Sequence, residues 1–223
     1  MKKRMLVALL SLAAVGAGAA PFDAKAVPDT ARWVVHADLD ALKATRVGGF
    51  IMGHFEKGAA ADKMAALAAM LQFDPRRDLE GMTVYGTSQK PEEAVAQFSG
   101  TFNGEQLVTL LKANPSYMLM AHGAQPIHSW IDEKRPEVRQ YGAIVGNKVL
   151  ISQGLPALQE AVDVLVGGKP ALDAVKRFGA LPVEAPFFMA GTDMQGFGEQ
   201  AGEAQILSQT RNASLSLGEA FGK

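Results

Sequence analysis

The chain has 223 residues, 48% of them hydrophobic, with 22 Lys and Arg against 23 Asp and Glu and no cysteine. The lack of cysteine excludes disulfides, thiolate metal sites, iron–sulfur clusters, cysteine nucleophiles and a lipoprotein anchor. The balanced charge argues against nucleic-acid binding and against a polybasic membrane-surface protein, because both need a clustered basic surface.

The first 20 residues have the pattern of a secretory signal peptide. Residues 2–4 are basic, residues 5–15 are apolar, and small residues precede a cleavage site at Ala19 or Ala20. The apolar run is shorter than the roughly 20 residues that span a bilayer, which favours cleavage over an uncleaved anchor. Loss of three basic residues leaves 22 less 3, or 19, against 23 acidic ones, a net charge of about −4. We expect an exported protein, periplasmic or extracellular, with no membrane span after cleavage.

The first half of the mature chain predicts both strands and helices. Residues 32–37 are β-branched and aromatic, as in a strand, and Asp40 is expected to cap a helix that begins after it. An apolar stripe with helical spacing over residues 64–71 predicts a second helix, which ends before Pro75. Further expected elements are a hairpin of strands at residues 82–85 and 94–102, and a helix at residues 104–113 that Asn103 is expected to cap.

The second half is richer in strands. Residues 117–121 are expected to pair with 126–131, and residues 140–145 with 148–152 across a two-residue turn. The short turns favour an α+β fold, an antiparallel sheet with helices packed on one face, over a doubly wound parallel sheet. The remaining expected elements are helices at residues 156–166 and 201–209 and strands at residues 186–190 and 213–217.

Two stretches share one layout, a strand that runs into an aspartate. Residues 33–40 match residues 186–193, with Asp40 aligned to Asp193. The repeat suggests two related lobes: a signal peptide at 1–20, an α+β domain at 21–180, and the start of a second, truncated lobe at 181–223. Truncation is expected because an unpaired last strand would leave a sheet edge exposed.

His36 and Asp38 are the candidate metal ligands. They lie at i and i+2, on one face of the expected strand, as a His/Asp metal pair would. No H-x-x-x-H or H-E-x-x-H spacing supplies further ligands, so structural roles are favoured for both residues.

Two other motifs are candidates for ligand binding. Arg76 and Arg77 could hold an anion, although a solvated turn with local Arg–Asp pairing is the commoner outcome. Trp130 could form a stacking platform for a sugar, although a tryptophan on a strand more often packs in the core. Catalytic motifs such as the Gly-x-Ser-x-Gly elbow, the P-loop and the dinucleotide fingerprint are missing from the sequence.

Four segments together resemble an uncharacterised family of exported bacterial proteins. They are residues 33–36 with Asp38, residues 73–79, residues 83–86 and residues 127–130. The likeness covers most of the mature chain, and members of that family usually continue past the point where this chain stops. The resemblance implies export and truncation, and it implies no activity.

The sequence therefore favours a non-catalytic exported protein that binds a ligand or partner in the cell envelope. We expect no cofactor and no nucleic-acid partner, and the identity of the ligand or partner stays open. The alternative is an exported hydrolase or metal-dependent enzyme that uses His36 and Asp38. Geometry separates the two, because the alternative needs His36, Asp38 and a third ligand to converge on one pocket.

Overall fold

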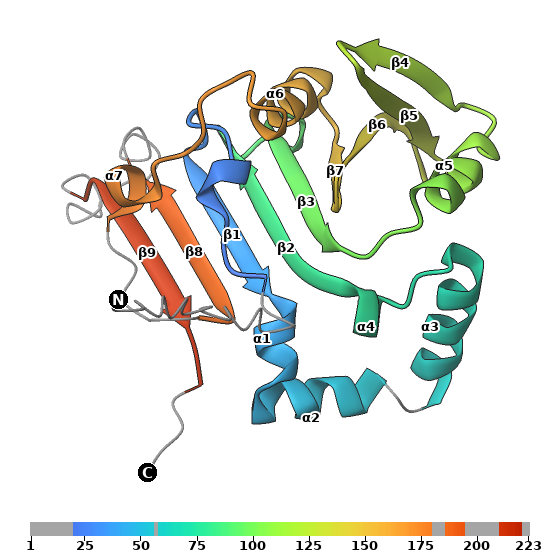
Figure 1. Cartoon of the computed structure of the whole chain (residues 1–223), viewed down its shortest axis with the longest axis horizontal. Coiled ribbons are helices and arrows are strands. Elements are labelled where there is room, and N and C mark those ends of the chain that lie inside the picture. Colours follow the sequence, from blue (N-terminus) through green and yellow to red (C-terminus); the bar gives the residue numbers. More distant parts are fainter. Residues whose placement is uncertain (1–19, 56–57, 180–185, 195–209, 220–223) are drawn as a thin grey trace, which may run out of the picture.

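A single antiparallel sheet organises the protein. The computed structural model describes residues 20–55, 58–179, 186–194 and 210–219, and in these ranges nine strands pair in the order β4-β5-β6-β7-β3-β2-β1-β8-β9 (Figure 1). The expected α+β class is confirmed. Residues 1–19 of the expected signal peptide at 1–20, and the expected helix at 201–209, lie outside the described residues. The strands are β1 (Trp33–Asp38), β2 (Leu79–Gly86), β3 (Ala94–Gly100), β4 (Met118–His122), β5 (Gln125–Asp132), β6 (Arg135–Val145), β7 (Lys148–Ser152), β8 (Phe188–Asp193) and β9 (Asn212–Leu217).

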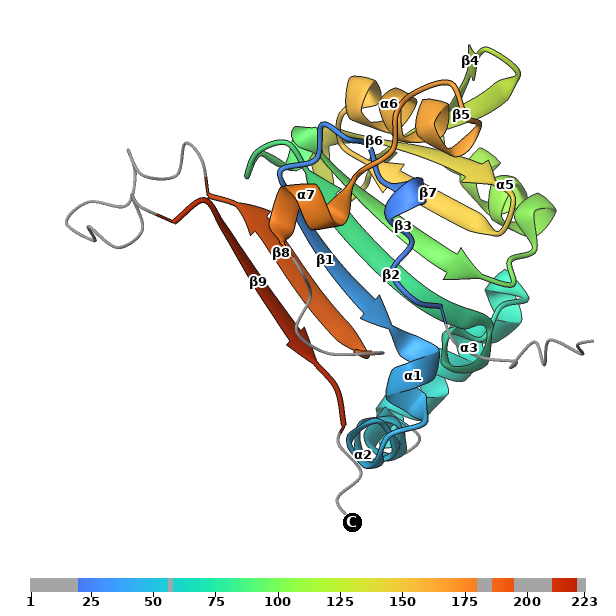
Figure 2. The same ribbon diagram turned by 60° about the vertical axis from the view of Figure 1, so that its left-hand side comes forward.

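The helices occupy two regions around the sheet. α6 packs across β3, β6 and β7, and α7 packs on β8 and β9, so both cover the same face (Figure 1). α1, α2 and α3 follow β1 and extend beyond the end of the sheet (Figure 2). The helices are α1 (Leu39–Lys43), α2 (Arg46–Phe55), α3 (Gly58–Leu71), α4 (Pro75–Asp78), α5 (Gly104–Lys112), α6 (Leu155–Leu165) and α7 (Ala174–Phe178), with 3₁₀ helices η1 (Ala24–Ala26) and η2 (Pro91–Glu93).

The core lies between the sheet and its α6 and α7 cover. Successive side chains of a strand point to opposite faces, and in β1 and β8 every second residue is buried. Full burial of a Val or Leu side chain contributes about 1.5–3 kcal/mol, so this face supplies much of the stability. The core cluster contains Val27, Ala31, Val34, Tyr85, Val95, Ile127, Ala143, Leu150, Leu158, Ala161, Val162, Leu172, Phe178 and Met189.

The helix that follows β1 begins earlier than expected. Asp38, not Asp40, is its N-cap, because the Asp38 carboxylate accepts a hydrogen bond from the Ala41 amide at 2.8 Å. Asp40 lies in the first turn and pairs with Lys43 at 2.8 Å. The prediction for Asp40 is wrong because the strand ends at Asp38, so the first orphan amides of the helix face that side chain.

Three helices were not expected from sequence: α2, α4, where a turn was expected, and α7. α2 contains the pair Gly48 and Gly49, and glycine is about 1 kcal/mol less favourable than alanine inside a helix. α7 has five residues, which is too short to show an apolar period. It is held instead by Phe178, which is buried against β8.

β8 and β9 continue the sheet formed by the first seven strands. β8 pairs with β1 along most of its length, and β9 pairs with β8 on the outer side. The segment expected to begin a second lobe therefore shares one sheet with the domain before it, through the β1–β8 pair.

Candidate functional site

His36 lies on the buried face of β1, where two neighbours use both of its ring nitrogens. Nε2 lies 3.0 Å from the Ala20 carbonyl and Nδ1 lies 2.9 Å from the Thr83 hydroxyl. Because a carbonyl only accepts, Nε2 carries the proton and Nδ1 accepts from Thr83. Burial lowers the pKa of His36 below its ordinary value, so the ring is held neutral at pH 7.

Asp38 also has a structural partner, the amide of Ala41 at the start of α1. Its carboxylate is buried, with 3% of the residue exposed, and caps α1. Across the described part of the chain, no three His, Cys, Asp or Glu side chains are grouped so that they could hold a metal ion. The structure thus brings no third ligand to His36 and Asp38, and both side chains have structural partners.

Arg76 and Arg77 form local ion pairs in α4, the four-residue helix before β2. Arg76 binds Asp74 through two hydrogen bonds, of 2.9 Å from Nε and 2.7 Å from Nη2. Arg77 binds Asp78, with its Nε 2.6 Å from Oδ1. The hydrogen bonds from Arg76 lower the pKa of Asp74 to about 2. Both guanidinium groups are therefore committed to neighbouring carboxylates.

Trp130 packs on the sheet and also borders a groove. It is half-buried on β5, and a Cβ built on Gly142 of β6 would lie 3.1 Å from its ring, so the indole lies over that glycine. It lines a shallow groove of about 440 Å³ together with Gln140 and Gln153. Trp130 therefore packs against the neighbouring strand, as a core tryptophan does.

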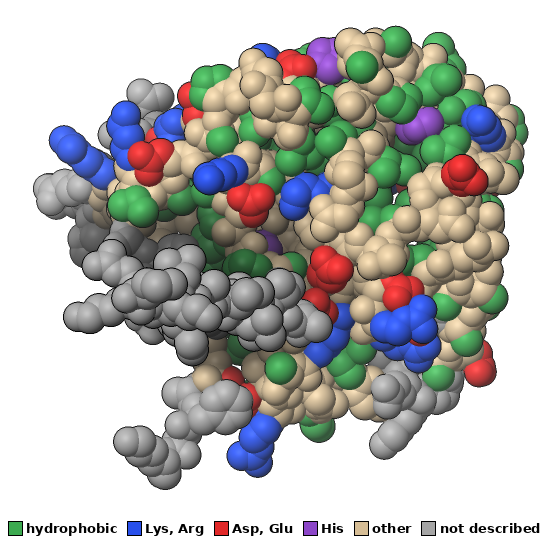
Figure 3. Space-filling view, in the orientation of Figure 1, with side chains coloured by type: hydrophobic (Ala, Val, Ile, Leu, Met, Phe, Trp, Pro, Cys, Tyr) green, Lys and Arg blue, Asp and Glu red, His purple; other side chains and the backbone are tan. Residues whose placement is uncertain are grey.

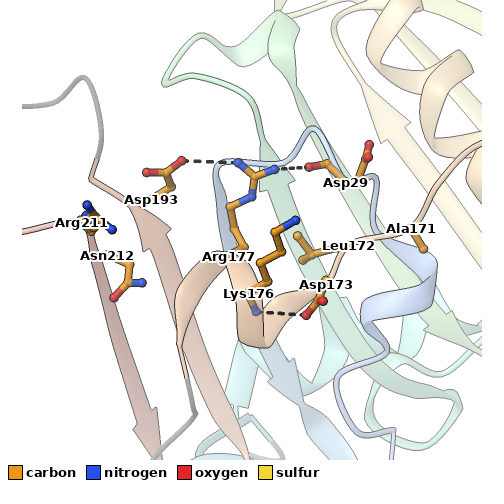
Figure 4. A pocket seen from close by; sticks show the side chains of 9 residues that line it. All are labelled: Asp29, Ala171, Leu172, Asp173, Lys176, Arg177, Asp193, Arg211 and Asn212. Atoms are coloured by element: carbon orange, nitrogen blue, oxygen red, sulfur yellow. Dashed lines mark hydrogen bonds and ion pairs between the residues drawn. The ribbon is translucent and has the colours of Figure 1, made fainter.

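A larger pocket lies at the other end of the sheet, beside β8 and β9. Its volume is about 530 Å³, and four separate segments meet there (Figure 4). Side chains of both charges gather over α7 and the adjoining strand ends in the space-filling view (Figure 3). We call this the basic pocket; its lining residues are Asp29, Ala171, Leu172, Asp173, Lys176, Arg177, Asp193, Arg211 and Asn212.

Arginines neutralise the buried carboxylate of the basic pocket. Asp193, 9% exposed, ends β8 and lies 3.5 Å from Arg177 Nη1 and 3.8 Å from Arg32 Nε. Nη2 of Arg177 donates a hydrogen bond to the Asp29 carbonyl, so this guanidinium connects the segment before β1 to the end of β8 (Figure 4). A buried carboxylate needs such partners, because an unpaired charge is strongly disfavoured away from water.

Two further cations line the basic pocket, and neither of them neutralises a buried carboxylate. The side chains of Lys176 and Arg211 are exposed, and neither forms an ion pair with a carboxylate of the described residues. Asp173, the nearest acidic neighbour in sequence, is used to cap α7 through the Lys176 amide. The basic pocket thus presents two cationic groups on elements that Arg177 and Asp193 already hold in place.

Sequence reasoning missed the basic pocket. Lys176 and Arg177 lie in a short helix that was not expected, and Arg211 lies just before β9. The only signal in the sequence was the presence of cations in the C-terminal region, and no spacing connects them. Their proximity follows from the pairing of β8 with β9 and the docking of α7 on both strands.

Comparisons with known proteins add a partial likeness of shape. No family model and no curated protein matches the chain. Two solved structures of TP0453 are similar to it: crystal form III, with a TM-score of 0.45 and 8% identity over 83% of this chain and 70% of that one, and crystal form I, with a TM-score of 0.42 and 11% identity over 80% and 65%. None of the helices in the described ranges has the length and apolar character needed to cross a membrane.

Proposed function

We propose that the protein is an exported, non-catalytic binding protein of the cell envelope, and that its basic pocket takes a small ligand with a carboxylate or phosphate group. The observation that carries this proposal is the pair of exposed cations, Lys176 and Arg211, beside a pocket of about 530 Å³. That volume is within the range of ligand sites for small molecules, roughly 300–1,000 Å³.

The charges favour an anion over a neutral ligand. The lining holds three cations, Lys176, Arg177 and Arg211, and three carboxylates, Asp29, Asp173 and Asp193. Arg32, which pairs with Asp193 from outside the lining, leaves one net positive charge. Lys176 and Arg211 are the cations exposed to a ligand, and a guanidinium binds carboxylate or phosphate oxygens through two parallel hydrogen bonds. Hydrogen bonds to charged groups contribute about 1.5–3 kcal/mol each, enough for selective binding of a small anion.

Export is supported by the leader-like pattern of the first 20 residues and by the resemblance to exported bacterial proteins. A non-catalytic role is supported by the engagement of His36 with Thr83 and of Asp38 with the start of α1, since those two side chains were the residues on which an enzyme was considered.

Calorimetric titration of the purified protein with inorganic phosphate and with succinate, at low ionic strength, tests the proposal. We expect saturable binding of at least one of the two anions, weakened about tenfold by Arg211→Ala or Lys176→Ala. Lys134→Ala is the matched control, because Lys134 is an exposed cation on the β5–β6 turn, outside the basic pocket. If neither anion binds, or if all three variants weaken binding equally, the basic pocket is not an anion site.

A further inference from the structure

We propose a second binding site, for the protonated amine of a small apolar molecule, in a separate cavity of about 330 Å³ between β2, η2 and α6. The segment before β1 divides the two sites: Asp29 lines the basic pocket, whereas Thr30 and Ala31 line this cavity. We call it the Tyr85 cavity. It does not depend on the anion site, because the two share no lining residue.

The hydroxyl of Tyr85 is the first observation for this site. Tyr85 lies on β2 with 2% of its surface exposed, and its hydroxyl oxygen has no hydrogen-bond partner among the described residues. A buried hydroxyl is almost always paired, and Tyr85 is one of the residues that line this cavity. Burial, followed by the negative charge of Glu160, raises the pKa of Tyr85, so the group stays a neutral phenol.

The charge of the cavity is the second observation. Glu92, Glu93 and Glu160 line it, and no Lys or Arg does. Glu160 accepts a hydrogen bond from the Thr30 hydroxyl at 3.1 Å, and Glu93 accepts one from Thr87, also at 3.1 Å. One cation is near, Lys90, which lies 3.7 Å from Glu93 and is mostly exposed. The carboxylates therefore outnumber the cations, and the cavity favours a positive ligand.

The rest of the cavity wall is apolar, which favours a ligand with an apolar group. Pro28, Ala31, Val95, Pro156 and Ala157 contribute hydrocarbon surface without a hydrogen-bonding side chain. An alkyl or aryl group buries well against such a wall, while its ammonium group meets the carboxylates. The N–H groups of the amine can donate both to Glu160 and to a lone pair of the Tyr85 oxygen, so one head group satisfies both observations.

The test compares three probes of equal chain length by calorimetry on the full protein: hexylamine, hexanol and hexanoate. We expect hexylamine to bind, hexanol to bind about tenfold more weakly, and hexanoate not to bind, because only the ammonium is attracted by the three glutamates. Glu160→Gln should reduce the preference for hexylamine over hexanol.

Tyr85→Phe isolates the hydroxyl. Its loss should weaken hexylamine binding about two- to tenfold, the range of one net hydrogen bond. The melting temperature should stay the same or rise, because the hydroxyl has no partner to lose in the empty protein. Tyr141→Phe is the matched control, on β6 and outside both sites.

Three results would overturn the proposal. Hexanol that binds as tightly as hexylamine would show that the glutamates do not select a cation. Unchanged hexylamine affinity in Tyr85→Phe would show that the hydroxyl does not contact the ligand. Hexylamine binding that is lost in Arg211→Ala would place the amine in the basic pocket, whereas loss of phosphate binding alone in that variant leaves the Tyr85 cavity unaffected.

Discussion

Asp38 and Asp193 hold the same position in two adjacent strands. The amide of Asp38 donates to the Phe187 carbonyl at 2.9 Å, and the amide of Asp193 donates to the Arg32 carbonyl at 2.6 Å. Each aspartate ends its strand, and each carbonyl belongs to the residue just before the partner strand. The two hydrogen bonds are therefore related by a local twofold axis between β1 and β8.

The strand pairing follows the same axis. The first residue of β1, Trp33, pairs with Thr192, the fifth of β8, and the first residue of β8, Phe188, pairs with Ala37, the fifth of β1. Asp38 is thus the counterpart of Asp193, and the alignment of Asp40 with Asp193 is displaced by two residues. The displacement arose because β8 begins at Phe188, later than the sequence pattern indicated.

The first prediction concerns the cap of α1. Replacement of Asp38 by Ala should cost about 0.5–2 kcal/mol of unfolding free energy, because the Ala41 amide loses its acceptor. Asp40→Ala removes only a partly exposed pair with Lys43 and should cost less, about 0–1 kcal/mol. Urea unfolding of both variants compares them, with Asp38→Asn as the control that keeps a cap. A larger loss for Asp40→Ala would contradict the assignment.

The second prediction concerns His36 and pH. Burial lowers its pKa in the folded protein, so the folded state binds fewer protons than the unfolded chain near pH 6. The contribution of His36 to stability is then present above the ordinary histidine value of about 6.5 and declines as the pH falls below it. Urea unfolding at pH 5, 6 and 7 should show this decline, and His36→Gln should reduce it. An unchanged slope in the variant would assign the decline to other groups.

The third prediction concerns Asp74. Hydrogen bonds from Arg76 lower the pKa of this carboxyl to about 2, so their stabilising effect is present above the ordinary value and is lost as the pH falls toward 2. In Arg76→Ala, the pKa of Asp74 should rise toward its ordinary value. Titration of the carboxyl by NMR measures it directly, and Arg135→Ala is the control at a distant turn. A pKa that does not rise would assign the shift to the Asp74 backbone contacts.

The fourth prediction concerns the packing of α7, which carries two residues of the basic pocket, against β8. A Cβ on Gly191 of β8 would lie 2.8 Å from the Phe178 ring, so Gly191→Ala should displace Phe178 and, with it, α7. Overpacking of this kind costs about 1–3 kcal/mol. Because α7 carries Lys176 and Arg177, phosphate affinity should fall together with the melting temperature.

Gly49→Ala is the matched control for that variant. A Cβ on Gly49 would have no heavy atom within 4 Å, and the residue lies in α2, which extends beyond the end of the sheet opposite α7 (Figure 1). This change should be neutral or stabilising, by up to about 1 kcal/mol, because alanine is the better helix former. A Gly191→Ala protein with unchanged phosphate affinity would mean that α7 does not position the site.

Elements that depend on neighbouring residues could be predicted from the sequence. The β6–β7 hairpin was expected from Gly146 and Asn147, and the structure pairs Val145 with Lys148 across them, with Gly146 at a φ of +60°. The start of α5 was expected from Asn103, whose side chain accepts from the Gln106 amide. Such features follow from the dihedral preferences and capping groups of a few consecutive residues.

The sites could not be predicted in this way, because their residues meet through long-range pairing. Arg177 reaches Asp193 only after α7 docks on β8, and Tyr85 comes near Glu160 only after α6 packs over the sheet. The assembled core then takes Tyr85 out of water without giving its hydroxyl a partner, and it groups cations from α7 and the start of β9 at one pocket. Neither result has a local signature, since burial and charge proximity are properties of the packed sheet and not of any short stretch of chain.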